Sequence, residues 1–221
     1  IQIGQAADVI EAICDVIKAL VVDYLHIVGD IFDRGPRADL VLDELMKEDS
    51  IDIQWGNHDV LWMGAASGSK ACIATVVNNS ITYKNLDVVE IGYGISLRSL
   101  SLFANEVYGN SDIEGYMPKG EQTDNFTPTD DDMLVARMHK AISVIQFKLE
   151  GQTILANPEF DMGHRLLLDK IDRDKGTVRI GDKEYPIKDT DFPTLDMENP
   201  YELTEGENQV MQYLKNAGKE S

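Results

Sequence analysis

The side chains best suited to chemistry lie in two short polar blocks, residues 29–35 and residues 56–59. Carboxylate and amide oxygens are ligands that Mn²⁺ and Mg²⁺ favour, and imidazole is acceptable to Mn and Fe. Two such ions about 4 Å apart can hold a hydroxide between them and neutralise a phosphate during in-line attack. The blocks therefore predict a site for divalent metal ions against a phosphate ester. Its expected members are Asp30, Asp33, Arg34, Asn57 and His58.

The weight of this prediction comes from the two blocks together. A single Gly-Asp after a strand, or a single Asn-His-Asp, is common, and an Asp in such a turn often only caps the next helix. Here both blocks begin with glycine and follow a short apolar run. Arg34 can bind phosphate oxygens with its forked guanidinium, and His58 beside a carboxylate can protonate a leaving alkoxide. The pair of blocks favours a metal site over two unrelated turns.

Two strands and one helix must position the blocks. Residues 24–28 form a nearly continuous apolar run, typical of a strand buried on both faces, and residues 51–55 form a second strand. Between them, Pro36 suits the first turn of a helix whose apolar residues recur at helical spacing over residues 38–45. This order predicts a right-handed crossover with parallel strands. Both blocks then lie at the carboxyl ends of the strands, where open α/β sheets build ligand sites.

Apolar periodicity and turn residues predict the remaining elements. Helices are expected at residues 5–20, 60–66, 70–77, 96–107 and 160–168, in a stretch opened by Thr127 as cap and Pro128 in the first turn, and after a capping box at residues 204–207. A strand is expected at residues 86–89, and a β-hairpin at residues 177–187, where Pro186 places the second strand at an edge. The acidic residues 110–132 are expected to form an exposed, mobile loop.

Composition restricts the partners of the chain. Its 221 residues include 39 acidic and 20 basic side chains, which give a net charge of −19. This charge argues against binding to nucleic acid or an anionic membrane, because each requires a positive field. No apolar run reaches about 18 residues, so no membrane span is expected. Cys14 and Cys72 both lie in apolar segments, and we expect two buried thiols in a reducing cytoplasm rather than one disulfide.

Three histidines outside the blocks are weaker candidates for chemistry. His26 belongs to the first predicted strand, which favours a buried structural role. His139 neighbours Lys140 in a predicted helix and is expected to be solvated. His164 follows Gly163 but lacks the second histidine of a Gly-His-x-His motif, so we do not expect it to bind a metal.

The two blocks also resemble a known family. They are similar to the second and third signatures of the calcineurin-like metallophosphatases, and Arg34-Gly35 after Asp33 is the phosphoprotein-phosphatase-like version. The longer context is more specific, because it resembles class III fructose-1,6-bisphosphatase of bacteria. The segments that carry this resemblance are residues 25–36, 52–62, 68–70, 145–150 and 165–172, and the similarity runs through essentially the whole chain.

The resemblance implies a role for each residue of the blocks. Asp30 would bridge two metal ions, and Asn57 would bind the second ion through its amide oxygen. His58 would be the general acid, oriented by Asp33, and Arg34 together with His58 would hold the transferred phosphate. Asp59 stands beside these residues and is expected to support the metal ligands from behind rather than to bind metal. The implied cofactor is a pair of Mn²⁺ ions, with Mg²⁺ and Fe as alternatives.

The implied fold and reaction follow from the same resemblance. The fold would be an α/β class metallophosphatase α/β/β/α sandwich, with residues 1–95 in its core and residues 96–221 as a mainly helical insertion with a β-hairpin. The implied reaction is the gluconeogenic hydrolysis of fructose 1,6-bisphosphate to fructose 6-phosphate and phosphate. A small sugar bisphosphate would be the partner. Whether the protein forms a homo-oligomer is left open by the sequence.

Two alternatives to this reading remain. A related metallophosphatase could act on phosphoproteins or dinucleoside polyphosphates, and a non-catalytic module could keep the metallophosphatase fold. The family's first signature, Asp-x-His followed by Gly, and its two later ligand histidines have no counterpart in this sequence. We therefore expect these residues alone to form an incomplete site, with the remaining metal ligands outside the sequence.

Overall fold

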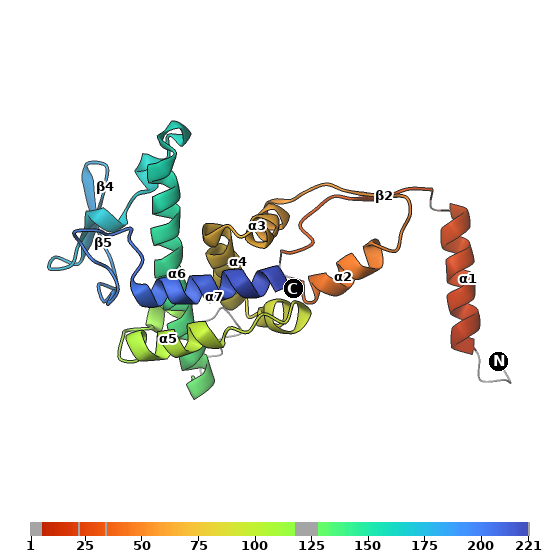
Figure 1. Ribbon diagram of the computed structural model, residues 1–221, viewed down its shortest axis with the longest axis horizontal. Helices are drawn as coiled ribbons and strands as arrows, with labels where there is room; N and C mark the ends of the chain where they lie inside the picture. The colour runs from red at the N-terminus through yellow and green to blue at the C-terminus, as the bar shows by residue number, and fades with distance from the viewer. Residues whose placement is uncertain (1–5, 22, 34, 118–127, 221) are drawn as a thin grey trace.

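A computed structural model describes residues 6–21, 23–33, 35–117 and 128–220. The chain is of the α/β class, with helices and two small sheets (Figure 1). Its helices are α1 (Ala6–Val21), α2 (Ala38–Leu45), α3 (Asn57–Ala66), α4 (Lys70–Thr82), α5 (Arg98–Tyr108), α6 (Asp130–Ala156) and α7 (Glu205–Glu220). Its strands are β1 (Leu25–Ile27), β2 (Ile51–Ile53), β3 (Ile171–Asp172), β4 (Thr177–Ile180) and β5 (Lys183–Pro186).

The predicted strand–helix–strand unit is confirmed. Strands β1 and β2 pair in parallel, with Leu25 opposite Ile51 and Ile27 opposite Ile53, and α2 connects them. The helix begins later than predicted, because Arg37 precedes it as the N-cap with a left-handed φ of 60°, which leaves Pro36 outside the first turn. Strand β1 nevertheless ends at Ile27 and β2 at Ile53, shortly before the polar blocks begin at residues 29 and 56.

The prediction that β1 is buried on both faces is wrong. Leu25 and Ile27 are half-buried, while Val28 just after the strand is 80% exposed. In the described part of the chain this sheet has only two strands, and α1 stands apart from the other helices with its apolar side chains exposed (Figure 1). A nearly continuous apolar run therefore does not by itself ensure that both faces of a strand are covered.

The core lies among helices α4, α5, α6 and α7. Their apolar faces meet in one cluster, whose fully buried members include Ala74, Ile81, Leu100, Ile142, Ile145 and Met211. Burial of a Leu, Ile or Met side chain stabilises a fold by about 1.5–3 kcal/mol relative to full exposure. Helix α7 starts at the predicted capping box, where the Thr204 hydroxyl accepts the Glu207 N–H and the Glu207 carboxylate accepts the Thr204 N–H. This core gives α4 a rigid base next to the strand–helix–strand unit.

A second sheet contains the predicted hairpin. Strands β3, β4 and β5 pair antiparallel in that order, with Val178 opposite Tyr185. Pro186 lies on the edge strand β5, as predicted, because its missing N–H is tolerated there. Strand β3 is too short to leave a pattern in the sequence and was not predicted.

Three local predictions are corrected by the structure. Residues 86–89 do not form a strand, since Val88–Gly92 is a π-helical turn. Residues 160–168 form short 3₁₀ turns rather than one helix. Helix α6 is capped by Thr129, which accepts the Asp132 N–H, so Pro128 precedes the helix. Thr127 lies outside the described residues, as do residues 118–127 of the predicted mobile loop.

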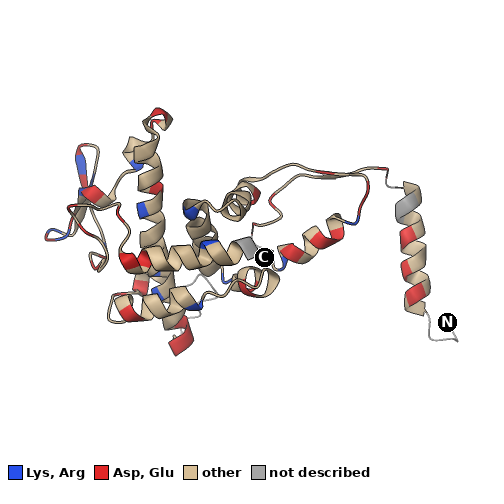
Figure 2. Cartoon of the chain, viewed as in Figure 1, with Lys and Arg blue, Asp and Glu red and all other residues tan. Residues whose placement is uncertain are grey.

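The structure also shows where the acidic side chains and the two cysteines lie. Acidic side chains occur on several helices, including α1 and α2 (Figure 2). Within the described ranges, none of the helices has the length and apolar character needed to cross a membrane. Cys14 and Cys72 are free thiols, but Cys14 is exposed and Cys72 half-buried, so the prediction that both are buried is wrong.

Candidate active site

The two polar blocks meet through their glycines. A side chain on Gly29, whose φ is +94°, would lie 2.5 Å from the Gly56 backbone nitrogen. A side chain on Gly56 would lie within about 2 Å of a carboxylate oxygen of Asp30. Such distances are far below van der Waals contact, so only glycine permits this approach. The leading glycine of each block thus lets the two loops pack backbone to backbone.

The buried carboxylate of Asp59 joins the two loops by hydrogen bonds. Its carboxylate accepts the backbone N–H groups of Asp30 at 2.6 Å, Phe32 at 3.2 Å and Gly56 at 2.9 Å. The residue is only 6% exposed, and three backbone donors provide the hydrogen bonds that a buried carboxylate needs. Asp59 therefore fixes the backbone on both sides of the site.

Asp30 lies over the first turn of α3. One of its carboxylate oxygens accepts the backbone N–H of His58 at 3.1 Å, one of the N–H groups that a helix start leaves unpaired. Asp30 itself has a left-handed φ of 55°, a conformation that is uncommon for residues other than glycine. The carboxylate predicted to bridge metal ions is thus held one residue away from Asn57, the other predicted ligand.

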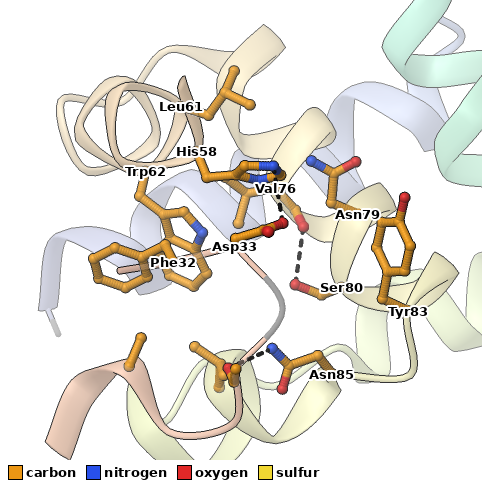
Figure 3. Close-up of a pocket in the computed structure, with 13 residues that line it drawn as sticks. Phe32, Asp33, His58, Leu61, Trp62, Val76, Asn79, Ser80, Tyr83 and Asn85 are labelled. Carbon is orange, nitrogen blue, oxygen red and sulfur yellow. Dashed lines mark hydrogen bonds and ion pairs between the residues drawn. The ribbon is translucent and has the colours of Figure 1, made fainter. Parts of the chain in front are cut away.

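His58 and Asp33 form the pair that the sequence predicts. The His58 Nε2 lies 3.1 Å from an Asp33 carboxylate oxygen, and their side chains are 21% and 38% exposed. Figure 3 shows both side chains at a hollow between the two blocks and α4. The hollow has a volume of about 20 Å³, room for about one water molecule. A sugar phosphate would therefore have to bind on its open side.

The walls of this hollow include residues that sequence reasoning missed. Phe32 stacks on Trp62 with ring centroids 4.6 Å apart, and Trp62 packs against Tyr93 at 5.4 Å. Opposite them, the end of α4 presents Asn79, Ser80 and Tyr83, and Asn85 follows (Figure 3). The aromatic residues Phe32 and Trp62 lie inside the quoted motifs. The polar residues of α4 carry no signal, since they read as an ordinary helix end.

The donor set fits part of a metal site. The Asp30 carboxylate and the Asn57 amide are hard oxygen donors of the kind that Mn²⁺ and Mg²⁺ favour. Within the described ranges, no group of three or more His, Cys, Asp or Glu side chains could hold a metal ion. Two donors supply only part of the shell of about six that these ions take. Arg34, predicted to bind phosphate, lies outside the described residues.

The histidines outside the blocks have other partners. His26 is not buried as predicted, because its ring Nδ1 pairs with Asp52 at 2.8 Å on an exposed strand edge. His139 is not solvated, since its ring nitrogens bond the Tyr116 carbonyl at 2.7 Å and the Thr82 hydroxyl at 3.1 Å. The exposed His164 lies in a 3₁₀ turn.

Comparisons with known proteins cover the whole chain. The family described as Firmicute fructose-1,6-bisphosphatase matches residues 1–221. A fructose-1,6-bisphosphatase class 3 of Listeria monocytogenes is 53% identical over 211 residues, which are 96% of this chain and 32% of that protein. Proteins of the same name from Clostridium acetobutylicum and Clostridium tetani are 49% and 52% identical over 98% and 97% of this chain, each over 32% of their own length.

The matches cover nearly all of this chain but only part of each relative. The chain spans about a third of the length of the curated relatives that it matches. No solved structure matches it. Because the match extends over every residue of the sequence, the chain belongs to the Firmicute fructose-1,6-bisphosphatase family.

Proposed function

We propose that the native protein containing these residues hydrolyses fructose 1,6-bisphosphate to fructose 6-phosphate and phosphate. Two relatives that are 53% and 49% identical to this chain, each over 32% of their own length, are named for that activity. The observation that carries the proposal is the His58–Asp33 pair, 3.1 Å apart, at the carboxyl ends of two parallel strands. Ligand sites of α/β sheets are built at such strand ends.

The acid step belongs to His58. When the phosphorus–oxygen bond of the ester breaks, the leaving sugar oxygen needs a proton, and a positioned imidazolium can donate it. Asp33 contacts His58 Nε2, so one ring nitrogen is oriented by the carboxylate, while the Phe32 and Trp62 rings keep one side of the hollow apolar. Asp33 would then orient His58 toward the leaving oxygen.

The proposed cofactor is Mn²⁺, with Mg²⁺ and Fe as alternatives. Asp30 and Asn57 would hold it, together with further ligands. When bound, divalent ions at this place would supply positive charge that neutralises the phosphate and favours the ionised nucleophile. The need for such charge is strong here, because the chain carries a net charge of −19 and the substrate is an anion.

The finer description of the fold is part of the same proposal. We propose that β1, α2 and β2 belong to a metallophosphatase α/β/β/α sandwich. The support is the parallel register of β1 and β2 and the placement of both polar blocks after them.

The test is phosphate release by the native protein from three substrates. Fructose 1,6-bisphosphate should be hydrolysed, while a phosphopeptide and a dinucleoside polyphosphate should react far more slowly. Treatment with EDTA should abolish the reaction, and added Mn²⁺ should restore it. His58→Gln should lower kcat by about 10²- to 10⁴-fold, the usual contribution of a general acid. The exposed His164→Gln is the matched control and should keep full activity.

Each alternative has its own outcome in this experiment. Faster hydrolysis of the phosphopeptide or the dinucleotide would replace the sugar bisphosphate as substrate. No metal-dependent hydrolysis of any of the three would favour a non-catalytic module. Unchanged kcat in the His58→Gln variant would remove His58 from the chemistry.

A further inference from the structure

Asn85 connects the core of the molecule to the loop that carries Asp33. Its side-chain amide nitrogen donates a hydrogen bond to the Gly35 carbonyl at 3.1 Å, across 50 positions of the sequence. Gly35 lies two residues after Asp33, and Asn85 and Asp33 line the same hollow (Figure 3). The bond therefore connects the end of α4 to the active-site loop.

The backbone at Asn85 is held rigidly. The Asn85 N–H donates to the Ser80 carbonyl at 2.8 Å, and the Lys84 N–H donates to the Ile81 carbonyl at 3.2 Å. Lys84 has a left-handed φ of 55°. These features make up a Schellman motif, which ends a helix by backbone bonds alone. Helix α4 is itself anchored by buried residues such as Ile81.

The Asn85 side chain therefore plays no part in ending the helix, because the bonds of the Schellman motif are made by backbone atoms. The helix end needs the backbone N–H of residue 85, which every residue except proline supplies. Gly35 is exposed, so water could satisfy its carbonyl if the side chain were absent. Neither the end of the helix nor the hydrogen-bonding need of the Gly35 carbonyl requires the Asn85 side chain. The bond instead joins the active-site loop to the residue that follows α4.

The position of Asp33 in the loop depends on contacts that are individually weak. On its other side, the Asp33 N–H makes a long turn bond of 3.3 Å to the Asp30 carbonyl. The Asp33–His58 contact is partly exposed, and a partly exposed ion pair contributes little energy of its own. Catalytic side chains keep a productive geometry when neighbouring bonds fix their backbone.

We propose that Asn85 is a positioning residue of the active site, which holds the Gly35 carbonyl from the rigid end of α4 and so keeps Asp33 aligned with His58. The inference rests on the proposed function for its kinetic consequence. Its structural consequence, the order of the loop, can be measured without any substrate.

The test uses Asn85→Asp, which keeps the shape of the side chain, removes the donor and sets a carboxylate against the carbonyl. Asn85→Ala is the second variant, which removes the bond without repulsion. Asn85→His restores an N–H donor at a similar reach. Asn110→Asp, at an exposed turn, is the control for the added charge. All are made in the native protein containing these residues.

Two measurements are made on each variant. Hydrogen–deuterium exchange of the peptide covering residues 30–38 should become faster in Asn85→Asp and Asn85→Ala, with the peptide of α4 unchanged. For fructose 1,6-bisphosphate, kcat/KM should fall by about 10- to 100-fold, since small displacements of catalytic groups cost about this much. Thermal midpoints should stay within about 2 °C, as for surface changes generally. Asn85→His should recover most of both losses, and Asn110→Asp should show neither.

The other outcomes are decisive as well. Unchanged loop exchange with kcat/KM within twofold of the parent would overturn the positioning role. Faster exchange in both the loop and α4, with a lowered thermal midpoint, would also overturn it, since Asn85 would then only stabilise the helix end. If the parent protein does not hydrolyse fructose 1,6-bisphosphate but the loop exchange responds as expected, the proposed function fails while the positioning role stands.

Discussion

The carboxylate of Asp59 accepts the backbone N–H of Asp30 at 2.6 Å, although the two residues are 29 positions apart. The same carboxylate also accepts the Gly56 N–H at 2.9 Å, so one side chain holds the starts of both polar blocks. The relative position of Asp30 and His58 therefore depends on a residue that is buried beneath them. This dependence can be tested with a change that preserves shape.

Asp59→Asn should destabilise the fold and reduce phosphate release together. An amide has one accepting oxygen, so its NH₂ group would face a backbone N–H donor in a site that is 6% exposed. A buried donor left without an acceptor costs about 1–3 kcal/mol. The free energy of unfolding, measured with denaturant, should fall by that amount. Asp182→Asn, on the exposed hairpin turn, should change neither quantity, and an Asp59→Asn protein as stable as the parent would contradict this role.

Gly56→Ala should damage the site more than its size suggests. The added methyl group would lie within about 2 Å of the Asp30 carboxylate, so that carboxylate or the loop must move. We expect kcat for fructose 1,6-bisphosphate to fall by about 100-fold, the scale of a 1 Å misplacement. Gly163→Ala is the matched control, because nothing lies within 4 Å of a side chain there. Equal kcat values for the two variants would show that the contact between the glycine loops is not needed.

Much of the site's framework could be predicted from the sequence, for a clear physical reason. Parallel strands bring their carboxyl ends to one edge, so two polar blocks after β1 and β2 must be neighbours. Helices α1, α6 and α7 could be predicted as well, since each has apolar residues at helical spacing or a capping box. The His58–Asp33 contact, which the family resemblance implied, is found at this edge.

The remaining features depend on tertiary contacts that leave no local pattern. Val88 and Val89 favour a strand by their branched side chains, yet they form a π-helical turn because both are buried and none of the described strands lies beside them to pair. The three bonds of Asp59 depend on the close approach of the two loops at Gly29 and Gly56. Asn85 reads as an ordinary helix end until the fold brings Gly35 to it.

The acid stability of the fold should depend on Asp132. The backbone N–H and the hydroxyl of Thr129 hydrogen-bond to its carboxylate and lower the pKa of Asp132 from its usual range. A lowered pKa in the folded state means that the ionised carboxylate stabilises the helix start above the pKa of the unfolded chain. This contribution is lost as the pH falls through the folded-state pKa.

Thermal unfolding between about pH 7 and pH 2 should therefore separate the parent from Asp132→Asn. The variant should be less stable at neutral pH, and the difference should shrink as the acid range is entered. Asp131→Asn makes the same charge change one residue away, at a residue that is not a member of the Thr129–Asp132 capping box. A constant difference between the parent and Asp132→Asn across this range would show that the cap does not depend on the charge of Asp132.

The buried ion pair between Lys148 and Glu207 should be costly to break on one side only. The Lys148 ammonium donates to a Glu207 carboxylate oxygen and to the Thr194 carbonyl, both at 2.7 Å, and both charged side chains are fully buried. Lys148→Met leaves a buried carboxylate without its partner, which costs about 3–5 kcal/mol. The double variant Lys148→Met/Glu207→Gln should be less destabilised than the sum of the two single changes, because neither charge is then left alone. Denaturant unfolding of the four proteins measures this coupling. Strict additivity would show that the two residues stabilise α6 and α7 independently, through packing rather than through their charges.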